Sequence, residues 1–330
     1  MSYIMNDKNT YVDDSLKGIL RAHDRYIRCV NNNPRAICTT YGSVQDKVSV
    51  ITGGGYGHLP LFLGYVGHGL CDGCAVGNVF SPPSFDAIWA LTKHLQSKAG
   101  VLYLFGNYFN DSISFLNASE MANLEGIRNE TVKFCDDISS GDKRLERRGN
   151  AGAFFAYKIT GACAAEKNTL PFVKGIAERT ISNTSSFGVM ISPCHLPSSD
   201  SPLFDVPDNE IILGAGLHGE RGSTTHKAVS SRELVNLTLS ELLADQDLHG
   251  GDDIAILVNG LGGSAREDLY VVYNDLMNYL DDKRIHVRHS YVGNYATSME
   301  TIGLAISILK LDSELNYYLE APAESPFFVI

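Results

Sequence analysis

The fold is decided by the stretch Val48-Ser49-Val50-Ile51-Thr52-Gly53-Gly54-Gly55-Tyr56-Gly57-His58. Its first five residues are mostly apolar and β-branched, which predicts a buried strand that empties into a glycine-rich loop. Glycines allow positive φ angles and let the backbone come close to a ligand. Histidine can serve as a nucleophile or as a general acid or base near neutral pH. The stretch therefore predicts a strand-and-loop ligand site.

Two further stretches repeat this theme. The predicted strand 210–215 leads into a second glycine loop, Gly214-Ala215-Gly216-Leu217-His218-Gly219-Glu220-Arg221-Gly222. The buried strand predicted at 101–105 runs into Gly106-Asn107-Tyr108-Phe109-Asn110-Asp111, which we expect to be a polar loop that ends in a carboxylate. Ligands collect where strands end in open α/β sheets. We therefore expect the two histidine loops to form two walls of one small-molecule site.

Apolar strand-like runs alternate with amphipathic helical runs, which predicts an α/β fold of two layered α/β domains. A chain of 330 residues favours about two domains. A stretch rich in Ser, Pro and Asn near 180–201 is the best boundary, so we expect domains at 1–182 and 183–330. The further expected elements are helices at 84–96, 151–166, 231–244 and 267–280 and strands at 131–135, 254–258, 285–289 and 303–310.

Composition excludes several functions. The net charge of −11 disfavours a nucleic-acid or membrane surface on this chain, because phosphates need clustered Lys and Arg. Seven scattered cysteines and a start without a continuous hydrophobic run point to a reducing cytoplasm. No acidic cluster has metal-ligand spacing, so no metal is expected, and Asp136-Asp137 and Asp281-Asp282 are expected to be exposed pairs. His68 and His195 are minor site candidates, and the other histidines outside the glycine loops are expected to be structural.

Nucleotide binding is the main competing interpretation of the glycine loops. A phosphate-binding loop of the Walker type needs Gly-Lys-Ser/Thr at its end, and no lysine follows either loop in that way. The dinucleotide pattern needs a third glycine where His58 stands, and Asp72 comes somewhat early for the required acid. Both nucleotide interpretations are therefore disfavoured.

A resemblance to a known family rests on these loops and on stretches collinear with them. The chain resembles the dihydroxyacetone-binding subunits of the phosphotransferase-dependent dihydroxyacetone kinases, called DhaK, over nearly its whole length. The supporting stretches are Phe80-Ser81-Pro82-Pro83-Ser84-Phe85-Asp86, Arg147-Arg148-Gly149-Asn150-Ala151-Gly152, Asn183-Thr184-Ser185-Ser186-Phe187-Gly188-Val189, Leu257-Val258-Asn259-Gly260-Leu261-Gly262-Gly263 and Ala321-Pro322.

The resemblance implies a site and its chemistry. It implies that His218 binds dihydroxyacetone covalently as a hemiaminal, with His58 and Asp111 as hydrogen-bonding and acid/base groups. It implies no cofactor on this chain, because ADP and magnesium belong to a separate subunit, and it suggests a homodimer. The residues it implies for substrate binding are Gly54, Gly55, Tyr56, Gly57, His58, Gly106, Asp111 and His218.

Departures from the family pattern fall around that site. The DhaK pattern has a lysine where this chain has Gly106, a small residue at Tyr56, a glutamate at Leu59, Thr-Gly at Phe109-Asn110 and a proline at Arg221. The missing lysine removes positive charge where phosphoryl transfer would develop negative charge. With these departures the chain resembles the DhaQ-type coactivators, and this resemblance implies a protein that senses dihydroxyacetone and reaches DNA only through a TetR-type regulator, DhaS. The alternative is an active DhaK kinase subunit.

Overall fold

The structure is a computed structural model that describes residues 3–41, 46–199, 201–222 and 224–330. It divides into two compact units. Unit 1 consists of Met1–Phe134, Ala156–Arg179 and Leu315–Ile330, and unit 2 of Cys135–Phe155 and Thr180–Glu314. The domain boundary expected after residue 182 stays a prediction. The compact units differ from the expected domains, because unit 2 includes residues 135–155 and unit 1 includes residues 315–330.

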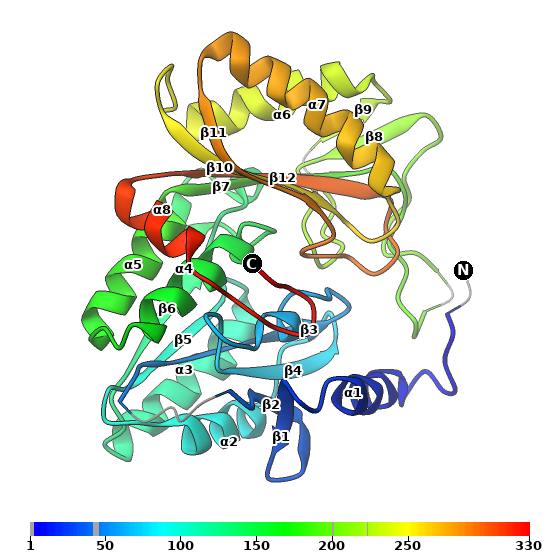
Figure 1. Cartoon of the computed structure of the whole chain (residues 1–330). Coiled ribbons are helices and arrows are strands. Elements are labelled where there is room, and N and C mark those ends of the chain that lie inside the picture. The colour runs from blue at the N-terminus through cyan, green and yellow to red at the C-terminus, as the bar shows by residue number, and fades with distance from the viewer. Residues whose placement is uncertain (1–2, 42–45, 200, 223) are drawn as a thin grey trace. The chain divides into compact units, whose positions relative to one another are not determined.

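Unit 1 is built on a six-stranded sheet in the order β1-β2-β4-β3-β5-β6 (Figure 1). Strands β4, β3, β5 and β6 run parallel to one another, while β2 pairs antiparallel with β4 and β1 pairs antiparallel with β2 at the edge. The strands are β1 (Ile27–Val30), β2 (Asn33–Thr39), β3 (Ser49–Tyr56), β4 (Gly73–Val79), β5 (Val101–Gly106) and β6 (Asn129–Phe134). The helices that lie wholly or mostly in unit 1 are α1 (Tyr11–Ala22), α2 (Phe85–Leu95), α3 (Phe109–Leu124), α4 (Ala153–Ala165), α5 (Leu170–Ser182) and α8 (Ser313–Glu320).

Helices cover both faces of this sheet. Helices α2 and α3 pack together on one face, where the side chains of Ile51 and Phe105 enter the core with Phe115 of α3. Successive side chains of a strand point to opposite faces. Thr52 therefore points to the other face, where its hydroxyl hydrogen-bonds Tyr157 of α4 at 2.8 Å. Because helices cover both faces of the sheet, every residue of the central strands β3 and β5 is buried.

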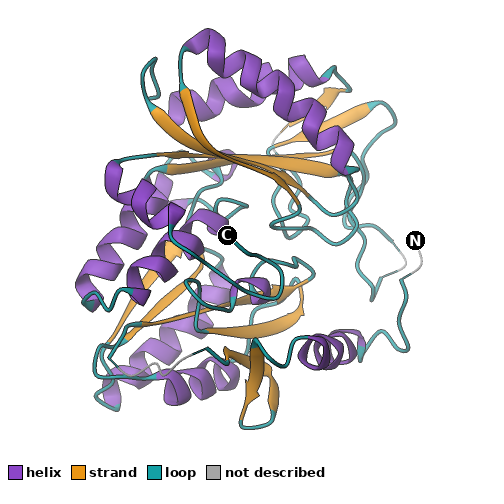
Figure 2. Cartoon of the chain, viewed as in Figure 1, coloured by secondary structure: helices purple, strands orange, loops and turns teal. Residues whose placement is uncertain are grey.

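Unit 2 carries a second six-stranded sheet in the order β11-β10-β12-β7-β8-β9. Only β10 and β11 are parallel, and the other pairs are antiparallel. Helices α6 and α7 pack together along one face, as Figure 2 shows in purple over orange strands. The elements are β7 (Thr184–Met190), β8 (Glu210–Leu213), β9 (Thr224–Lys227), α6 (Ser231–Asp245), β10 (Asp253–Gly260), α7 (Arg266–Lys283), β11 (His286–Gly293) and β12 (Gly303–Lys310).

The core of unit 2 lies between this sheet and its two helices. Leu239 and Leu242 of α6 and Leu276 of α7 pack there against Ile256 of β10 and Ile306 of β12. The helices expected from apolar periodicity at 231–244 and 267–280 therefore form within a few residues of the expected bounds. In the described part of the chain, the helices are too short or too polar to cross a bilayer.

Candidate functional site

In unit 1 the expectation that the glycines after Thr52 form a loop is wrong, because Gly53, Gly54, Gly55 and Tyr56 are the last residues of β3, at the carboxyl edge of the parallel strands. Gly57 has a φ of +102°, a conformation that favours glycine, and it turns the chain into His58. The His58 side chain is fully buried. Its ring stacks on Phe80, which follows β4, with the ring centroids 4.7 Å apart. His58 therefore sits where the ends of β3 and β4 meet.

The glycines at the end of β3 are required by close packing. A Cβ atom at Gly54 would lie 2.3 Å from the ring of Phe62, and one at Gly55 would lie 2.9 Å from the Cα atom of Phe80. Phe62 also meets the His58 ring edge to face. Gly54 and Gly55 therefore let two aromatic rings close around the imidazole.

Tyr56 is held by the first helix of unit 1. Its hydroxyl hydrogen-bonds Ser15, and its ring packs edge to face on Tyr11, both in α1. The tyrosine is 6% exposed, and burial raises the pKa of its phenol. Tyr56 thus links the end of β3 to α1.

Asp111 lies at the next strand end, but the segment before it is not a loop as expected. Helix α3 begins at Phe109, so Asp111 stands in the first helical turn. An acidic side chain such as Asp111 is favoured in the first turn of a helix by the positive end of the helix dipole, so the carboxylate is compatible with a helix start. The carboxyl is 6% exposed, and its Oδ1 has no hydrogen-bond partner among the described residues. Burial raises the pKa of Asp111 to about 7.

Gly106 ends β5 under an aromatic cover. A Cβ atom there would lie 2.8 Å from the ring of Tyr108 and 3.1 Å from the ring of Phe134. A longer side chain at this position would have to displace the Tyr108 ring. Gly106 stands where the family pattern has a lysine, and the rings of Tyr108 and Phe134 occupy the space that a side chain would need.

In unit 2, His218 lies in a loop that folds back on itself. Gly214 and Gly219 have φ angles of +77° and +72°, so both need a left-handed conformation. The backbone N–H of Gly216 donates to the carbonyl of Glu220 at 3.1 Å. The carboxylate Oε2 of Glu220 accepts from the backbone N–H of His218 at 2.9 Å. The loop thus presents the imidazole from a short, internally bonded turn.

The imidazole of His218 is kept uncharged. Its side chain is 13% exposed, and Nδ1 lies 3.9 Å from Oε1 of Glu220. Burial and the positive charge of Arg148 lower the pKa of His218 to about 3. The imidazole is therefore neutral at physiological pH, the protonation state that a nucleophile needs.

Arg148 is tied to the loop through Asp137. Its guanidinium donates to Oδ2 of Asp137 at 2.9 Å. Ser139 donates its backbone N–H to Asp137 at 3.1 Å and its hydroxyl to the carbonyl of Gly214 at 2.9 Å. In the sequence, Arg148 lies in a stretch that resembles the DhaK family, but no local pattern predicts a role for it. Its proximity to His218 depends on a contact far apart in sequence, which no local pattern encodes.

The expectation that Asp136 and Asp137 form an exposed pair is wrong. Asp136 is 1% and Asp137 is 0% exposed. Asp136 accepts from the backbone N–H groups of Asn150 and Gly152 and from the hydroxyl of Ser186. Hydrogen bonds satisfy the buried carboxylates, which permits burial of acids in a charged stretch. Asp281 and Asp282 are exposed as expected.

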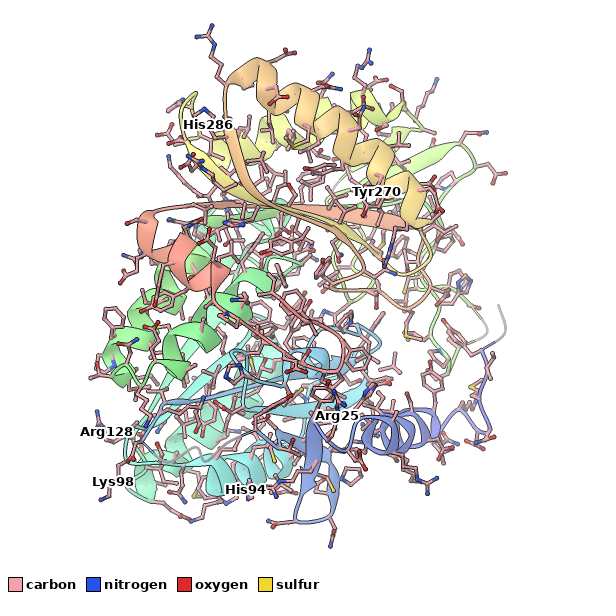
Figure 3. All side chains as sticks on the ribbon, in the orientation of Figure 1. Arg25, His94, Lys98, Arg128, Tyr270 and His286 are labelled. Carbon is pink, nitrogen blue, oxygen red and sulfur yellow. The ribbon has the colours of Figure 1, made fainter. Side chains whose placement is uncertain are left out.

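Histidines outside the glycine loops lie in other surroundings. His286, at the start of β11 in Figure 3, is exposed and pairs with Asp253 at 3.3 Å. His195 lies 3.3 Å from Glu300. Within the described ranges, no three His, Cys, Asp or Glu side chains are grouped to hold a metal. A hollow of about 700 Å³ beside Lys98 and Arg128 (Figure 3) lies at the amino edge of β5 and β6, away from His58.

The structure thus divides the expected site residues between the two units. Unit 1 brings Gly54, Gly55, Tyr56, Gly57 and His58 to the same sheet edge as Gly106 and Asp111, because β3 and β5 are parallel neighbours. Unit 2 carries His218 with Glu220 and Arg148.

These features define a class of protein with two helix-covered sheets, one bearing a buried proton-exchanging carboxyl and the other a neutral histidine on a glycine turn. The family model of the Dak1 domain matches residues 17–327. The chain therefore belongs to the Dak1 family, and the resemblance drawn from the sequence is confirmed. It is 36% identical, over 100% of both chains, to the dihydroxyacetone-binding subunit DhaK of the PTS-dependent dihydroxyacetone kinase 2 of Listeria innocua.

Solved structures share the fold. The dihydroxyacetone kinase of C. freundii matches with a TM-score of 0.89 and 28% identity, covering 98% of this chain and 59% of that one. The dihydroxyacetone kinase operon co-activator DhaQ matches with a TM-score of 0.87 and 28% identity, covering 94% of this chain and 96% of that one. The expected α/β fold of the DhaK type is confirmed.

Proposed function

We propose that this chain is a dihydroxyacetone-sensing coactivator. It binds dihydroxyacetone as a hemiaminal on His218 and acts, as a homodimer, with a TetR-type regulator to activate a dihydroxyacetone kinase operon. The observation that carries the proposal is the neutral imidazole of His218 on its glycine turn. Sensing needs only that the ligand be held, whereas a kinase subunit must also promote phosphoryl transfer.

The chemistry follows from the protonation states. A neutral imidazole nitrogen can add to the carbonyl carbon of a ketone, provided that an acid protonates the carbonyl oxygen. Asp111, whose pKa is raised to about 7, can donate or accept a proton at neutral pH. We assign the role of this acid to Asp111. We assign to His58 a hydrogen bond with the ligand, and to Gly54, Gly55 and Gly57 the floor of the binding site.

Covalent capture also explains selectivity. Dihydroxyacetone and glycerol differ by the carbonyl group, and glycerol offers no carbon for the imidazole to attack. Hydrogen bonds and packing alone discriminate weakly between molecules of such similar size. Bond formation therefore lets the protein respond to the ketone in the presence of the polyol.

The surroundings of Gly106 favour sensing over transfer. This glycine replaces a lysine of the family pattern, and the rings of Tyr108 and Phe134 close the space above it. Phe109, at the start of α3, is 80% exposed and adds apolar surface where the family pattern has threonine. A developing phosphoryl charge loses a cation here, a loss that costs about two or more orders of magnitude in rate at comparable sites. The structural likeness to the operon co-activator agrees with this proposal.

The second candidate is the dihydroxyacetone-binding subunit of a kinase. The full-length similarity to the Listeria DhaK subunit favours it. The candidates differ in one measurable respect. A kinase subunit yields triose phosphate when mixed with an ADP-carrying subunit and its phosphoryl donor, and a coactivator yields little or none.

Carbon-13 NMR with dihydroxyacetone labelled at its carbonyl carbon tests the proposal. We expect the ketone signal to be replaced by a protein-bound tetrahedral carbon in the wild type and in a His286→Ala control, but not in His218→Ala. Glycerol competitors should leave the signal unchanged. A bound tetrahedral carbon in folded His218→Ala would refute the assignment. Turnover to triose phosphate at the rate of a lysine-bearing subunit would establish the kinase alternative.

A further inference from the structure

We propose that Glu220 is a positioning residue that keeps the proton of the neutral His218 ring on Nδ1 and accepts that proton when the hemiaminal forms. The inference deepens the proposed function and rests on it for the identity of the ligand. The assignment of the tautomer itself can be tested without any ligand.

The carboxylate of Glu220 is fixed beside the imidazole. Oε2 accepts the backbone N–H of His218 at 2.9 Å, which places the other oxygen, Oε1, 3.9 Å from Nδ1. This gap of 3.9 Å is longer than a hydrogen bond, and contacts of this kind often shorten when a ligand binds. The nitrogen of a histidine that carries the proton is set by the hydrogen bond made on that side of the ring. A carboxylate on the Nδ1 side therefore favours the Nδ1–H tautomer.

The loop is built around this carboxylate. A Cβ atom at Gly216 would lie 2.3 Å from Oε2 of Glu220, so a side chain at this position would move the carboxylate from its place. Gly219, at a φ of +72°, reverses the chain and returns Glu220 to the backbone of His218. Gly216 before the histidine and Gly219 after it thus allow the side chain of Glu220 to reach the backbone of His218.

Arg148 supplies the opposite charge near the same point. Its guanidinium carbon would lie 3.2 Å from a Cβ atom at Gly216, and Asp137 holds it at 2.9 Å. Among the described residues of unit 2, the charged groups near His218 include the carboxylate of Glu220 and the guanidinium of Arg148. Arg148 opposes protonation of the ring, while Glu220 orients the one proton that the neutral ring carries.

The covalent step balances with these groups. The lone pair on Nε2 forms the bond to the carbonyl carbon, and the carbonyl π pair moves to the oxygen, which takes a proton from a general acid. The ring then carries a positive charge. Nδ1 releases its proton to the carboxylate of Glu220, which leaves a neutral hemiaminal. One proton is gained at oxygen and one is lost at Nδ1.

Nitrogen-15 NMR of histidine-labelled protein without ligand tests the tautomer. The His218 ring signals are identified by their loss in His218→Ala. We expect Nδ1 to carry the proton in the wild type and in Glu241→Gln, which changes an exposed carboxylate on α6. We expect a shift toward Nε2–H in Glu220→Gln, because the amide N–H can donate to Nδ1. An Nε2–H ring in the wild type, or an unchanged ring in Glu220→Gln, would overturn the proposal.

The rate of adduct formation provides the second measurement. Glu220→Gln keeps the size of the side chain and an oxygen for the backbone hydrogen bond, so it preserves the loop. We expect its rate to fall about tenfold to a hundredfold, as happens when partners that orient metal-binding histidines are removed. A wild-type rate would contradict the role of Glu220. A wild type without any adduct would refute the proposed function, and the ligand-free NMR result would still decide the tautomer.

Discussion

Asp111 and His218 have pKa values displaced in opposite directions. Burial raises the pKa of Asp111 to about 7, while burial and Arg148 lower that of His218 to about 3. Pairs of groups whose surroundings push their pKa values apart often mark acid and base roles. At neutral pH, Asp111 can therefore hold or release a proton, and the ring of His218 is neutral. In the proposed function, these protonation states allow Asp111 to donate a proton and His218 to attack the carbonyl.

The pH dependence of adduct formation should be one-sided. Asp111 must be protonated to donate, so the rate should fall as pH rises through about 7. It should not fall between pH 7 and pH 5, because His218 loses its neutral form only near pH 3. Rates of adduct formation from pH 5 to 9 measure this. Asp111→Asn should be slow and without the inflection near pH 7. A fall in wild-type rate below pH 6.5 would show that His218 titrates as an ordinary histidine.

At the scale of elements, helix α4 depends on one close contact. Gly161 lies in the middle of α4, and a Cβ atom there would lie 2.4 Å from the Cα atom of Leu70. Both residues belong to unit 1. The sequence predicts the helix from its small residues, and the contact gives the reason for a glycine inside it.

Gly161→Ala should therefore destabilise the protein by about 1–3 kcal/mol, the usual cost of overpacking, although alanine favours helices. Gly175→Ala is the matched control, because this glycine lies in α5 and nothing is within 4 Å of its Cβ position. The control should gain up to about 1 kcal/mol. Urea unfolding of both variants measures the difference. A Gly161→Ala variant as stable as the control would show that the loop at Leu70 yields easily.

At the scale of the whole molecule, charge limits the partners. The net charge of −11 opposes binding to DNA phosphates by this chain alone. In the proposed function, a basic TetR-type regulator makes those contacts. If dihydroxyacetone raises the affinity of this chain for the regulator by some factor, linkage requires the regulator to raise the affinity for dihydroxyacetone by the same factor.

Gel-shift titrations test this expectation. The chain alone should leave operator DNA unshifted, and with a co-encoded TetR-type regulator it should raise operator occupancy when dihydroxyacetone is present. The ligand effect should be lost in His218→Ala, while the His286→Ala control keeps it. Tight operator binding by the chain alone, or a regulator indifferent to the ligand, would contradict the coactivator role.

Much of the fold could be predicted from local patterns. The helix expected at 84–96 forms at Phe85–Leu95, where Ser84 caps its first turn, and the strand expected at 303–310 forms as Gly303–Lys310. Periodicity and caps act between residues near in sequence, so they can be read directly. The start of α3 at Phe109 was missed, because the polar residues before Asp111 resemble a loop.

Local patterns were enough to predict the α/β class, the two glycine-rich segments and the histidines beside them, because glycine and strand patterns involve residues close in sequence. They predicted a loop where Gly53, Gly54 and Gly55 continue β3. The protonation states of Asp111 and His218 depend on the tertiary structure. Burial of Asp111 raises its pKa, and Arg148, held by the buried Asp137, keeps His218 neutral. Desolvation and the field of a distant charge depend on which segments pack together in space. No local pattern contains that information, and it is what gives the histidine its chemistry.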